Sequence, residues 1–174
     1  MTDLVKVQFH VNGRPVDTTV PPDLPLIDFL REDLGLSGTR LCCGIGVCKA
    51  CTVAARRQPT SQAQPMLACS TPVALLQGQS ITTVEATGSM ERPSTIQQAF
   101  LDHFAFQCGY CTPGFVMATD MLIERLRAQP IHRDQLDAAI EDAVGQHICR
   151  CTGYARYHQA IRAVVLAENG LVNA

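Results

Sequence analysis

Cysteines are the residues of this chain whose type and spacing could do chemistry, and its 174 residues contain nine of them. Three follow the pattern Cys-x4-Cys-x2-Cys and a fourth lies further along; this group, named the loop set, is Cys43, Cys48, Cys51 and Cys69. Four thiolates at this plant-type spacing can hold a [2Fe–2S] cluster. Gly44 and Gly46 are expected at positive φ, because glycine lets backbone N–H groups approach the cluster sulfurs there. Zinc is the alternative, but zinc sites usually pair two Cys-x2-Cys hooks, which the x4 gap and the distant Cys69 do not provide.

A second group combines a Cys-x2-Cys hook with a Cys-x-Cys hook; this helical set is Cys108, Cys111, Cys149 and Cys151. Alone, the two hooks fit zinc as well as iron–sulfur. Thr112-Pro113 after Cys111 is typical of an N-cap and a first helical proline, and Thr152 after Cys151 of another N-cap. Helix N-termini favour an anionic centre. A zinc tetrathiolate is equally anionic, so it is the neighbouring loop set that favours a second redox centre.

The ninth cysteine, Cys42, is interpreted as a buried non-ligand, because pairing it with Cys48 leaves an x5 gap; the alternative is that it replaces Cys43. His147 precedes Cys149 by two residues and is an alternative ligand, but eight cysteines already fill two clusters. No secretory signal is visible in the first residues, so we expect a cytoplasmic, reducing location without disulfides. Export with a signal-bearing partner is the other possibility.

Two differently patterned halves should position these cysteines. The first half predicts a strand at 4–11, an Asn-Gly turn at 12–13, a strand at 14–20, a helix at 26–34, a cysteine loop at 42–51 and short strands at 52–55 and 81–85. The second half predicts four helices, at 94–104, 113–127, 134–144 and from 152 to about 165. The prediction is therefore α+β: an α+β domain at 1–85, a linker at 86–93 and an all-α four-helix domain at 94–174.

Composition narrows the function classes. The net charge of −2 gives no general attraction to nucleic acid or to an anionic membrane. No apolar run approaches the ~18 residues that a membrane span needs. The five histidines are scattered, and no catalytic acid, base or nucleophile is evident. The chain is expected to carry no catalytic site of its own.

The cysteine motifs carry a resemblance to a known family. They are CGIGVCKAC at 43–51, FQCGYCTPG at 106–114 and CRCTGY at 149–154. With them the chain resembles the small iron–sulfur subunit of the molybdenum hydroxylases, which include xanthine dehydrogenase, aldehyde oxidoreductase and carbon monoxide dehydrogenase. The resemblance covers nearly the whole chain, from the first hairpin to about residue 166.

The resemblance implies a plant-type ferredoxin-like (β-grasp) domain followed by the four-helix domain, each with one [2Fe–2S] cluster. It implies that single electrons pass from a molybdenum–pterin cofactor in a large partner to FAD in a medium partner or to another acceptor. Gln107 would contact the pterin and Cys151 would lie near it; capping of local backbone is the alternative role for Gln107. A free-standing two-cluster carrier or sensor is the alternative function, and a structural zinc protein is a third.

Two positions depart from the family pattern. Cys42-Cys43 stands where the family usually has Gly-Cys, and Lys49 stands where it has glycine. No ligand is lost, but the conformation of the loop and the potential of its cluster are put in question. The preferred interpretation is that Lys49 points to solvent. The substrate is not readable from this chain, because substrate contacts should lie on the large partner.

Overall fold

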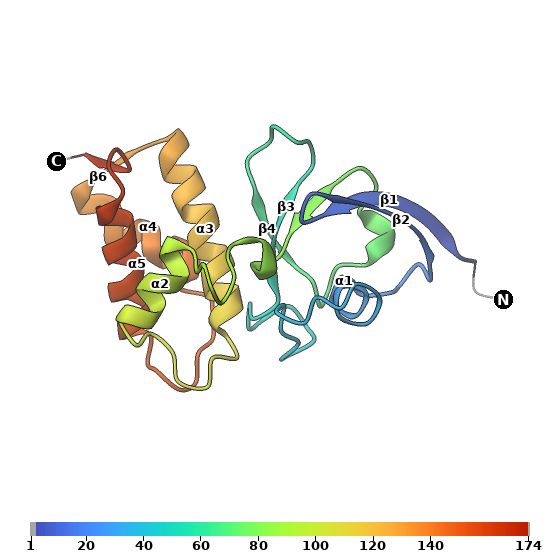
Figure 1. Ribbon diagram of the computed structural model, residues 1–174, viewed down its shortest axis with the longest axis horizontal. Coiled ribbons are helices and arrows are strands. Elements are labelled where there is room, and N and C mark those ends of the chain that lie inside the picture. The colour runs from blue at the N-terminus through green and yellow to red at the C-terminus, as the bar shows by residue number, and fades with distance from the viewer. Residues whose placement is uncertain (1–2, 174) are drawn as a thin grey trace.

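The computed structural model describes residues 3–173. A β-sheet forms in the first half of the chain and four longer helices form in the second, and the two halves lie side by side (Figure 1). The predicted mixture of α and β structure is confirmed. None of the helices within the described residues is long and apolar enough to cross a membrane.

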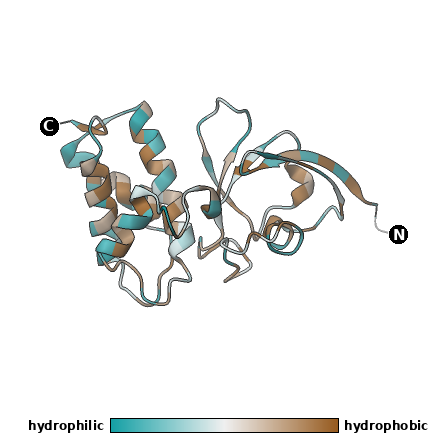
Figure 2. Ribbon diagram, viewed as in Figure 1, coloured by the Kyte–Doolittle hydropathy of each residue, from teal (hydrophilic) through white to brown (hydrophobic). Residues whose placement is uncertain are grey.

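The N-terminal hairpin forms as predicted. β1 (Val5–Val11) pairs antiparallel with β2 (Arg14–Val20). Asn12 and Gly13 connect them with φ of 52° and 77°, the positive values that a tight two-residue hairpin turn requires. Alternate side chains of β1 are buried, and its hydropathy alternates along the ribbon in Figure 2. One face of the hairpin thereby joins the core.

Three further strands complete the sheet, and one of them, at Gln64–Leu67, was not predicted from the sequence. They are β3 (Thr52–Arg56), β4 (Gln64–Leu67) and β5 (Ser80–Thr82), in the spatial order β2-β1-β5-β3-β4. β4 was missed because this short edge strand contains Pro65 and has no buried side chain. β5 ends before the predicted limit of 85, because the chain turns into a 3₁₀ helix at Val84–Ala86.

The helix predicted at 26–34 is only partly α-helical. α1 (Leu26–Asp28) is a single short turn, and a π-helical turn at Phe29–Asp33 continues it. The wider turn still buries Leu26, Ile27, Phe29 and Leu30 under the sheet. The apolar pattern therefore predicted correctly which face is buried, but it predicted an α-helix where most of the segment is π-helical.

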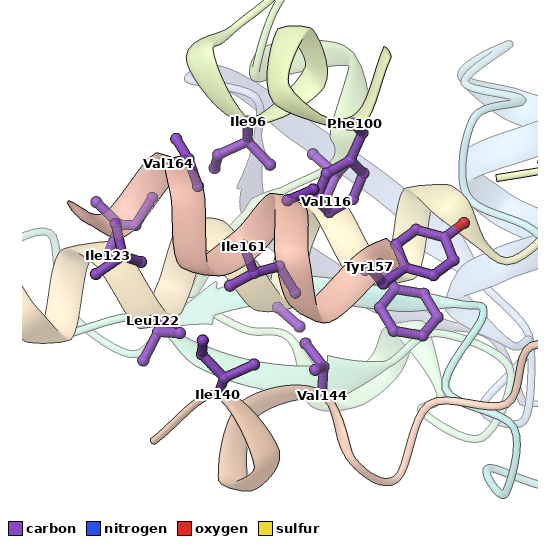
Figure 3. Packing of buried hydrophobic residues seen from close by; sticks show 14 of the residues in the cluster. Ile96, Phe100, Val116, Leu122, Ile123, Ile140, Val144, Tyr157, Ile161 and Val164 are labelled. Carbon is purple, nitrogen blue, oxygen red and sulfur yellow. The ribbon is translucent and has the colours of Figure 1, made fainter. Parts of the chain in front are cut away.

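The second half contains four helices around one apolar core. They are α2 (Thr95–Asp102), α3 (Thr112–Ala128), α4 (Leu136–Val144) and α5 (Ala155–Ala167). Ser94 caps α2: its hydroxyl accepts from the Gln97 N–H, and the Gln97 side-chain oxygen accepts in return from the Ser94 N–H. Figure 3 shows Ile161 of α5 surrounded by side chains of α2, α3 and α4. Two short strands that were not predicted, β6 (Ile131–His132) and β7 (Val172–Asn173), pair in parallel beside this core.

The first of these helices was predicted to continue to residue 104, and this was wrong. α2 ends at Asp102, and Phe104 takes a φ of 49° with 72% of its surface exposed. The Ala105 N–H donates to the Phe100 carbonyl at 2.9 Å, which is the closure of a Schellman motif with Phe104 at its left-handed position. Ala105 is fully buried in place of the larger ring.

The two halves pack through β3 and α3. A small apolar cluster joins them and consists of Ala54, Ala63, Met117 and Met121. Beside it Arg56 forms an ion pair with Glu124, which also accepts from the Ala63 N–H at 3.2 Å. Both cysteine sets are therefore held on one continuous scaffold.

Candidate metal centres

The loop set is organised around backbone N–H groups. Gly44 and Gly46 take φ of 69° and 75°, as predicted. N–H groups of Cys48, Ile45 and Val47 face the Cys43 sulfur, and they lower its pKa to about 6. The Cys48 nitrogen lies 3.4 Å from the Cys43 Sγ. This loop therefore stabilises negative charge on sulfur before any metal is considered.

The other thiols of the loop set are covered. Burial raises the pKa of Cys51 to about 12, with the Cys69 and Cys48 thiols close enough to raise it further. Burial also raises the pKa of Cys48. A buried thiolate needs a positive charge beside it, and a bound metal ion supplies that charge and deprotonates the thiol outright. The donor set thus fits an iron–sulfur centre.

The helical set has an outer and an inner pair of sulfurs. The Sγ atoms of Cys108 and Cys151 are 3.6 Å apart, and both residues are exposed. Cys111 is half-buried and Cys149 is buried. Burial raises the pKa of Cys111 to about 12, and the Cys149 thiol raises it further. Burial opposes ionisation of Cys149 as well, but hydrogen bonding from Thr152 lowers its pKa overall.

Tyr157 supports the inner pair and was not identified from the sequence. Its hydroxyl lies 2.7 Å from the Thr112 Oγ1 and 3.6 Å from the Cys111 Sγ. Its ring is fully buried and stacks on Phe115 with centroids 4.0 Å apart. Figure 3 shows its oxygen at the margin of the core. The sequence signal was a polar-tipped aromatic on the otherwise apolar stripe of α5, which residues at spacings of three and four define.

The predicted N-caps next to the helical set need correction. Cys111 itself occupies the N-cap of α3, so Thr112 and Pro113 lie in the first turn. Thr152 is not the N-cap of α5, because α5 begins at Ala155 and Tyr154 occupies its N-cap position with a φ of 71°. The Thr152 hydroxyl instead lies 3.1 Å from the Cys149 Sγ and accepts from the Tyr154 N–H. The Cys-x-Cys hook precedes its helix in a separate turn and is not the start of that helix.

The structure corrects the prediction for Cys42 and gives the backbone conformation of Lys49. Cys42 is exposed and not buried, because the loop from Leu41 to Val47 lies on the surface. Lys49 takes a φ of 61°, so it adopts the left-handed backbone that glycine favours, and the loop closes despite the departure from the family pattern. Its side chain is half-buried, and its charge is close enough to lower the pKa of His147.

Gln107 and His147 have different environments. Gln107 is exposed beside Cys108 at the outer pair of the helical set. His147 is buried with 6% of its surface exposed, and burial lowers its pKa to about 4. Its Nε2 lies 3.4 Å from the Thr52 Oγ1, and its Nδ1 has no hydrogen-bond partner among residues 3–173. These contacts connect His147 with the first half of the chain.

The cysteine sulfurs meet in pairs. All nine cysteines are free thiols. Among residues 3–173, no three His, Cys, Asp or Glu side chains form a group that could hold one metal ion. The close neighbours are Cys43 with Cys48, Cys51 with Cys69, Cys108 with Cys151, and Cys111 with Cys149.

Two protein-family models match the chain. The model described as 2Fe-2S iron-sulfur cluster binding domain matches residues 9–74. The model described as [2Fe-2S] binding domain matches residues 83–162. The loop set lies within the first match and the helical set within the second. The chain therefore contains two [2Fe–2S]-binding domains.

Known proteins resemble the chain over most of its length. A nicotinate dehydrogenase subunit of Pseudomonas putida is 37% identical over 161 residues, which cover 90% of this chain and 92% of the relative. The nicotinate dehydrogenase small FeS subunit of Eubacterium barkeri is 33% identical and is covered to 95%. A chain of the quinoline 2-oxidoreductase structure from Pseudomonas putida 86 is 33% identical, with a TM-score of 0.78 over 94% of this chain and 95% of that one.

Longer relatives match in one part only. The alignment with aldehyde oxidase 4 of Cavia porcellus covers 84% of this chain and 11% of that protein. The full-length relatives and the two matched domains agree with each other and with the pairing of the cysteines. The chain belongs to the family of small [2Fe–2S] electron-transfer subunits of the molybdenum hydroxylases.

Proposed function

We propose that the loop set and the helical set each bind one [2Fe–2S] cluster and that Cys42 and His147 bind none. The pairing of the sulfurs supports this, because a [2Fe–2S] cluster takes two thiolates on each of its two irons. A bound cluster accepts one electron at a time. The residues of this chain hold the thiolates, exclude water from the inner sulfurs and aim N–H groups at them. Residues 1–85 form the ferredoxin-like domain, 86–93 the linker and 94–174 the four-helix domain.

Electrons enter at the helical set and leave at the loop set. The observation that carries this order is the change in burial along the cysteines. Cys108 and Cys151 are exposed, and they lie next to the exposed Gln107. Cys149 of the helical set and Cys48 of the loop set are buried, whereas Cys43 of the loop set is half-buried. An exposed pair can face a molybdenum–pterin cofactor in a large partner, with Gln107 as the contact to the pterin and Cys151 near it.

The exit surface lies at the cysteine loop. Ile45 and Val47 expose 74% and 55% of their surfaces there, next to the half-buried Cys43. Exposed apolar side chains beside a redox centre suit an acceptor protein, and FAD in a medium partner is the acceptor proposed here. The whole complex would work in the cytoplasm.

Metal analysis and spin resonance test the two-cluster assignment. The purified complex should contain about four irons and four sulfides per copy of this chain, from two clusters of two irons each, and two distinct signals after reduction. A colourless zinc protein would refute the assignment. Copurification of a large molybdenum subunit separates the proposal from a free-standing carrier.

Two serine variants test the order of electron flow. With Cys48→Ser in the intact complex, substrate should still reduce the helical-set cluster in a single anaerobic turnover, while turnover with the acceptor is lost. With Cys111→Ser, the loop-set cluster should stay oxidised after substrate is added. The opposite pattern would reverse the proposed order.

A further inference from the structure

Three hydrogen bonds form a closed cycle in the turn that contains the Cys-x-Cys hook. The Cys149 N–H donates to the Tyr154 hydroxyl oxygen at 3.3 Å. The Tyr154 N–H donates to the Thr152 Oγ1 at 3.2 Å. The Thr152 Oγ1 lies in turn 3.1 Å from the Cys149 Sγ. The cycle therefore begins and ends at one buried cysteine, and we name residues 149–154 the hook turn.

The direction of the third hydrogen bond follows from the chemistry of its two groups. A cysteine that binds iron does so as a thiolate, so the Cys149 sulfur would carry no proton. The Thr152 hydroxyl already accepts the Tyr154 N–H through a lone pair, and it keeps one hydrogen to donate. That hydrogen is the only one that the contact between the Thr152 Oγ1 and the Cys149 Sγ can use. Thr152 therefore donates to a charged sulfur.

The backbone of the hook turn fixes the position of this donor. Gly153 and Tyr154 take φ of 64° and 71° in succession. Left-handed backbone is ordinary for glycine but uncommon for tyrosine, so surrounding contacts have to maintain it. The two hydrogen bonds of Tyr154 supply such contacts, one through its N–H and one through its hydroxyl. The Thr152 side chain is half-buried and β-branched, which further limits its rotation.

The hydroxyl adds to backbone donors at the same sulfur. N–H groups of Thr152 and Cys151 also face the Cys149 Sγ. Backbone N–H groups serve Cys43 of the loop set in the same way. An ordinary substitution leaves backbone donors in place, whereas it can remove a hydroxyl. Position 152 is therefore a point at which the sequence can change the charge balance at this sulfur without losing a ligand.

We propose that Thr152 is a positioning residue that raises the reduction potential of the helical-set cluster through its hydrogen bond to the Cys149 sulfur. This rests on the proposed function of the two sets. A reduced cluster carries one more negative charge than an oxidised cluster, and hydrogen bonds to its sulfurs set its potential. A donor stabilises the more negative state, because a hydrogen bond strengthens as its acceptor gains charge. Thr152 thereby increases the share of a single electron that the helical set holds against the loop set.

Removal of the hydroxyl in the intact complex tests the proposal. Thr152→Val keeps the shape of the side chain, and a redox titration followed by spin resonance should show a more negative potential for the helical-set cluster alone. In the one-electron-reduced complex, the ratio of reduced helical-set to reduced loop-set cluster should fall several-fold. Thr152→Ser keeps the O–H group and should restore both values. In D₂O, the reduced helical-set cluster should show an exchangeable deuteron that is lost in Thr152→Val and kept in Thr152→Ser.

Two control variants separate the hydrogen bond from general effects. The Thr119 hydroxyl donates to the Phe115 carbonyl at 2.7 Å inside the helical half. Thr119→Val is therefore the same substitution away from any cysteine, and it should leave both potentials unchanged. Tyr154→Phe opens the cycle at the Cys149 N–H but keeps the bond between Thr152 and the sulfur. It should shift the potential less than Thr152→Val does.

Iron content is measured in every variant, so that loss of the cluster is distinguished from a change in its potential. A wild-type potential in an iron-replete Thr152→Val, or an equally large shift in Tyr154→Phe, would overturn the inference. If Thr152→Val loses iron, the smaller Thr152→Ala is titrated in its place. Loss of iron from both would show that Thr152 supports the fold of the hook turn, and it would also overturn the inference. Absence of the helical-set cluster from the wild-type complex would overturn the proposed function instead.

Discussion

Removing one hydroxyl group should change both the stability of the helical half and the potential of its cluster. The Tyr157 hydroxyl reaches the Thr112 Oγ1 at 2.7 Å and the Cys111 Sγ at 3.6 Å, while the ring itself is fully buried. The pKa of Tyr157 is raised by burial, so the group stays protonated and can donate. Tyr157→Phe keeps the stacked ring and deletes only these two polar contacts.

The two effects have different expected sizes. Loss of a hydrogen bond to Thr112 should lower the free energy of unfolding by about 1 kcal/mol. A hydrogen bond to a charged acceptor stabilises by about 1 kcal/mol more than a hydrogen bond to a neutral acceptor. Because the Cys111 sulfur gains negative charge when the cluster is reduced, the hydrogen bond from Tyr157 should stabilise the reduced state by about this amount. For a one-electron couple that difference is about 40 mV, since ~1.4 kcal/mol equals ~59 mV. Tyr157→Phe should therefore lower the potential of the helical-set cluster by up to about 40 mV.

A redox titration followed by spin resonance measures the potential, and denaturant unfolding measures the stability. Thr112→Val and the double variant separate the Thr112 contact from the Cys111 contact in a thermodynamic cycle. Tyr110→Phe is the matched control, because that hydroxyl donates to the Leu41 carbonyl. An unchanged or raised potential in an iron-replete Tyr157→Phe would refute the reasoning.

Three further outcomes are expected. Burial and the nearby Glu124 raise the pKa of Asp120. Ionisation of Asp120 therefore destabilises the folded state as the pH rises above about 3.8, and Asp120→Asn should increase the free energy of unfolding at pH 7. Burial lowers the pKa of His147 to about 4, so its contribution to stability is present above pH ~6.5 and is lost as pH falls toward 4; His147→Gln should flatten that slope in denaturant titrations. Lys49→Gly removes the strain of a left-handed lysine backbone but adds conformational entropy to the unfolded chain, so the free energy of unfolding should change by less than about 1 kcal/mol. The variant also loses a positive charge near the loop set, so a redox titration should show a reduction potential of the loop-set cluster that is lower by tens of millivolts.

Features that repeat along the sequence could be predicted. The structure confirms the elements that follow from local sequence patterns: the alternating strand β1, the Asn12-Gly13 turn and the apolar stripes of the helices. The cysteine spacings predicted two sets, and the structure brings the sulfurs together in pairs that each lie within one predicted set. These signals are local, and tertiary contacts reinforce them.

Features that depend on tertiary packing could not be predicted. The helix predicted to reach residue 104 ends at Asp102, because Phe104 adopts the left-handed backbone that closes α2. Thr152 looked like a cap, but its hydroxyl is directed to Cys149. The role of Tyr157 depends on Cys111 and Thr112, which lie more than 40 residues away in the sequence, and no local pattern encodes that contact.

The unequal burial of the cysteines also bears on how the protein is made. Three thiols of the loop set, at Cys48, Cys51 and Cys69, are covered in the folded chain, whereas Cys108 and Cys151 of the helical set stay open to solvent. The inner thiols of the loop set are therefore most accessible to iron and sulfide while the sheet is still closing around them. The helical set can be filled later, through its open side, until the large partner covers it. Under the proposed order of electron flow, maturation would then run in the opposite direction, with the loop set filled first and the helical set completed last.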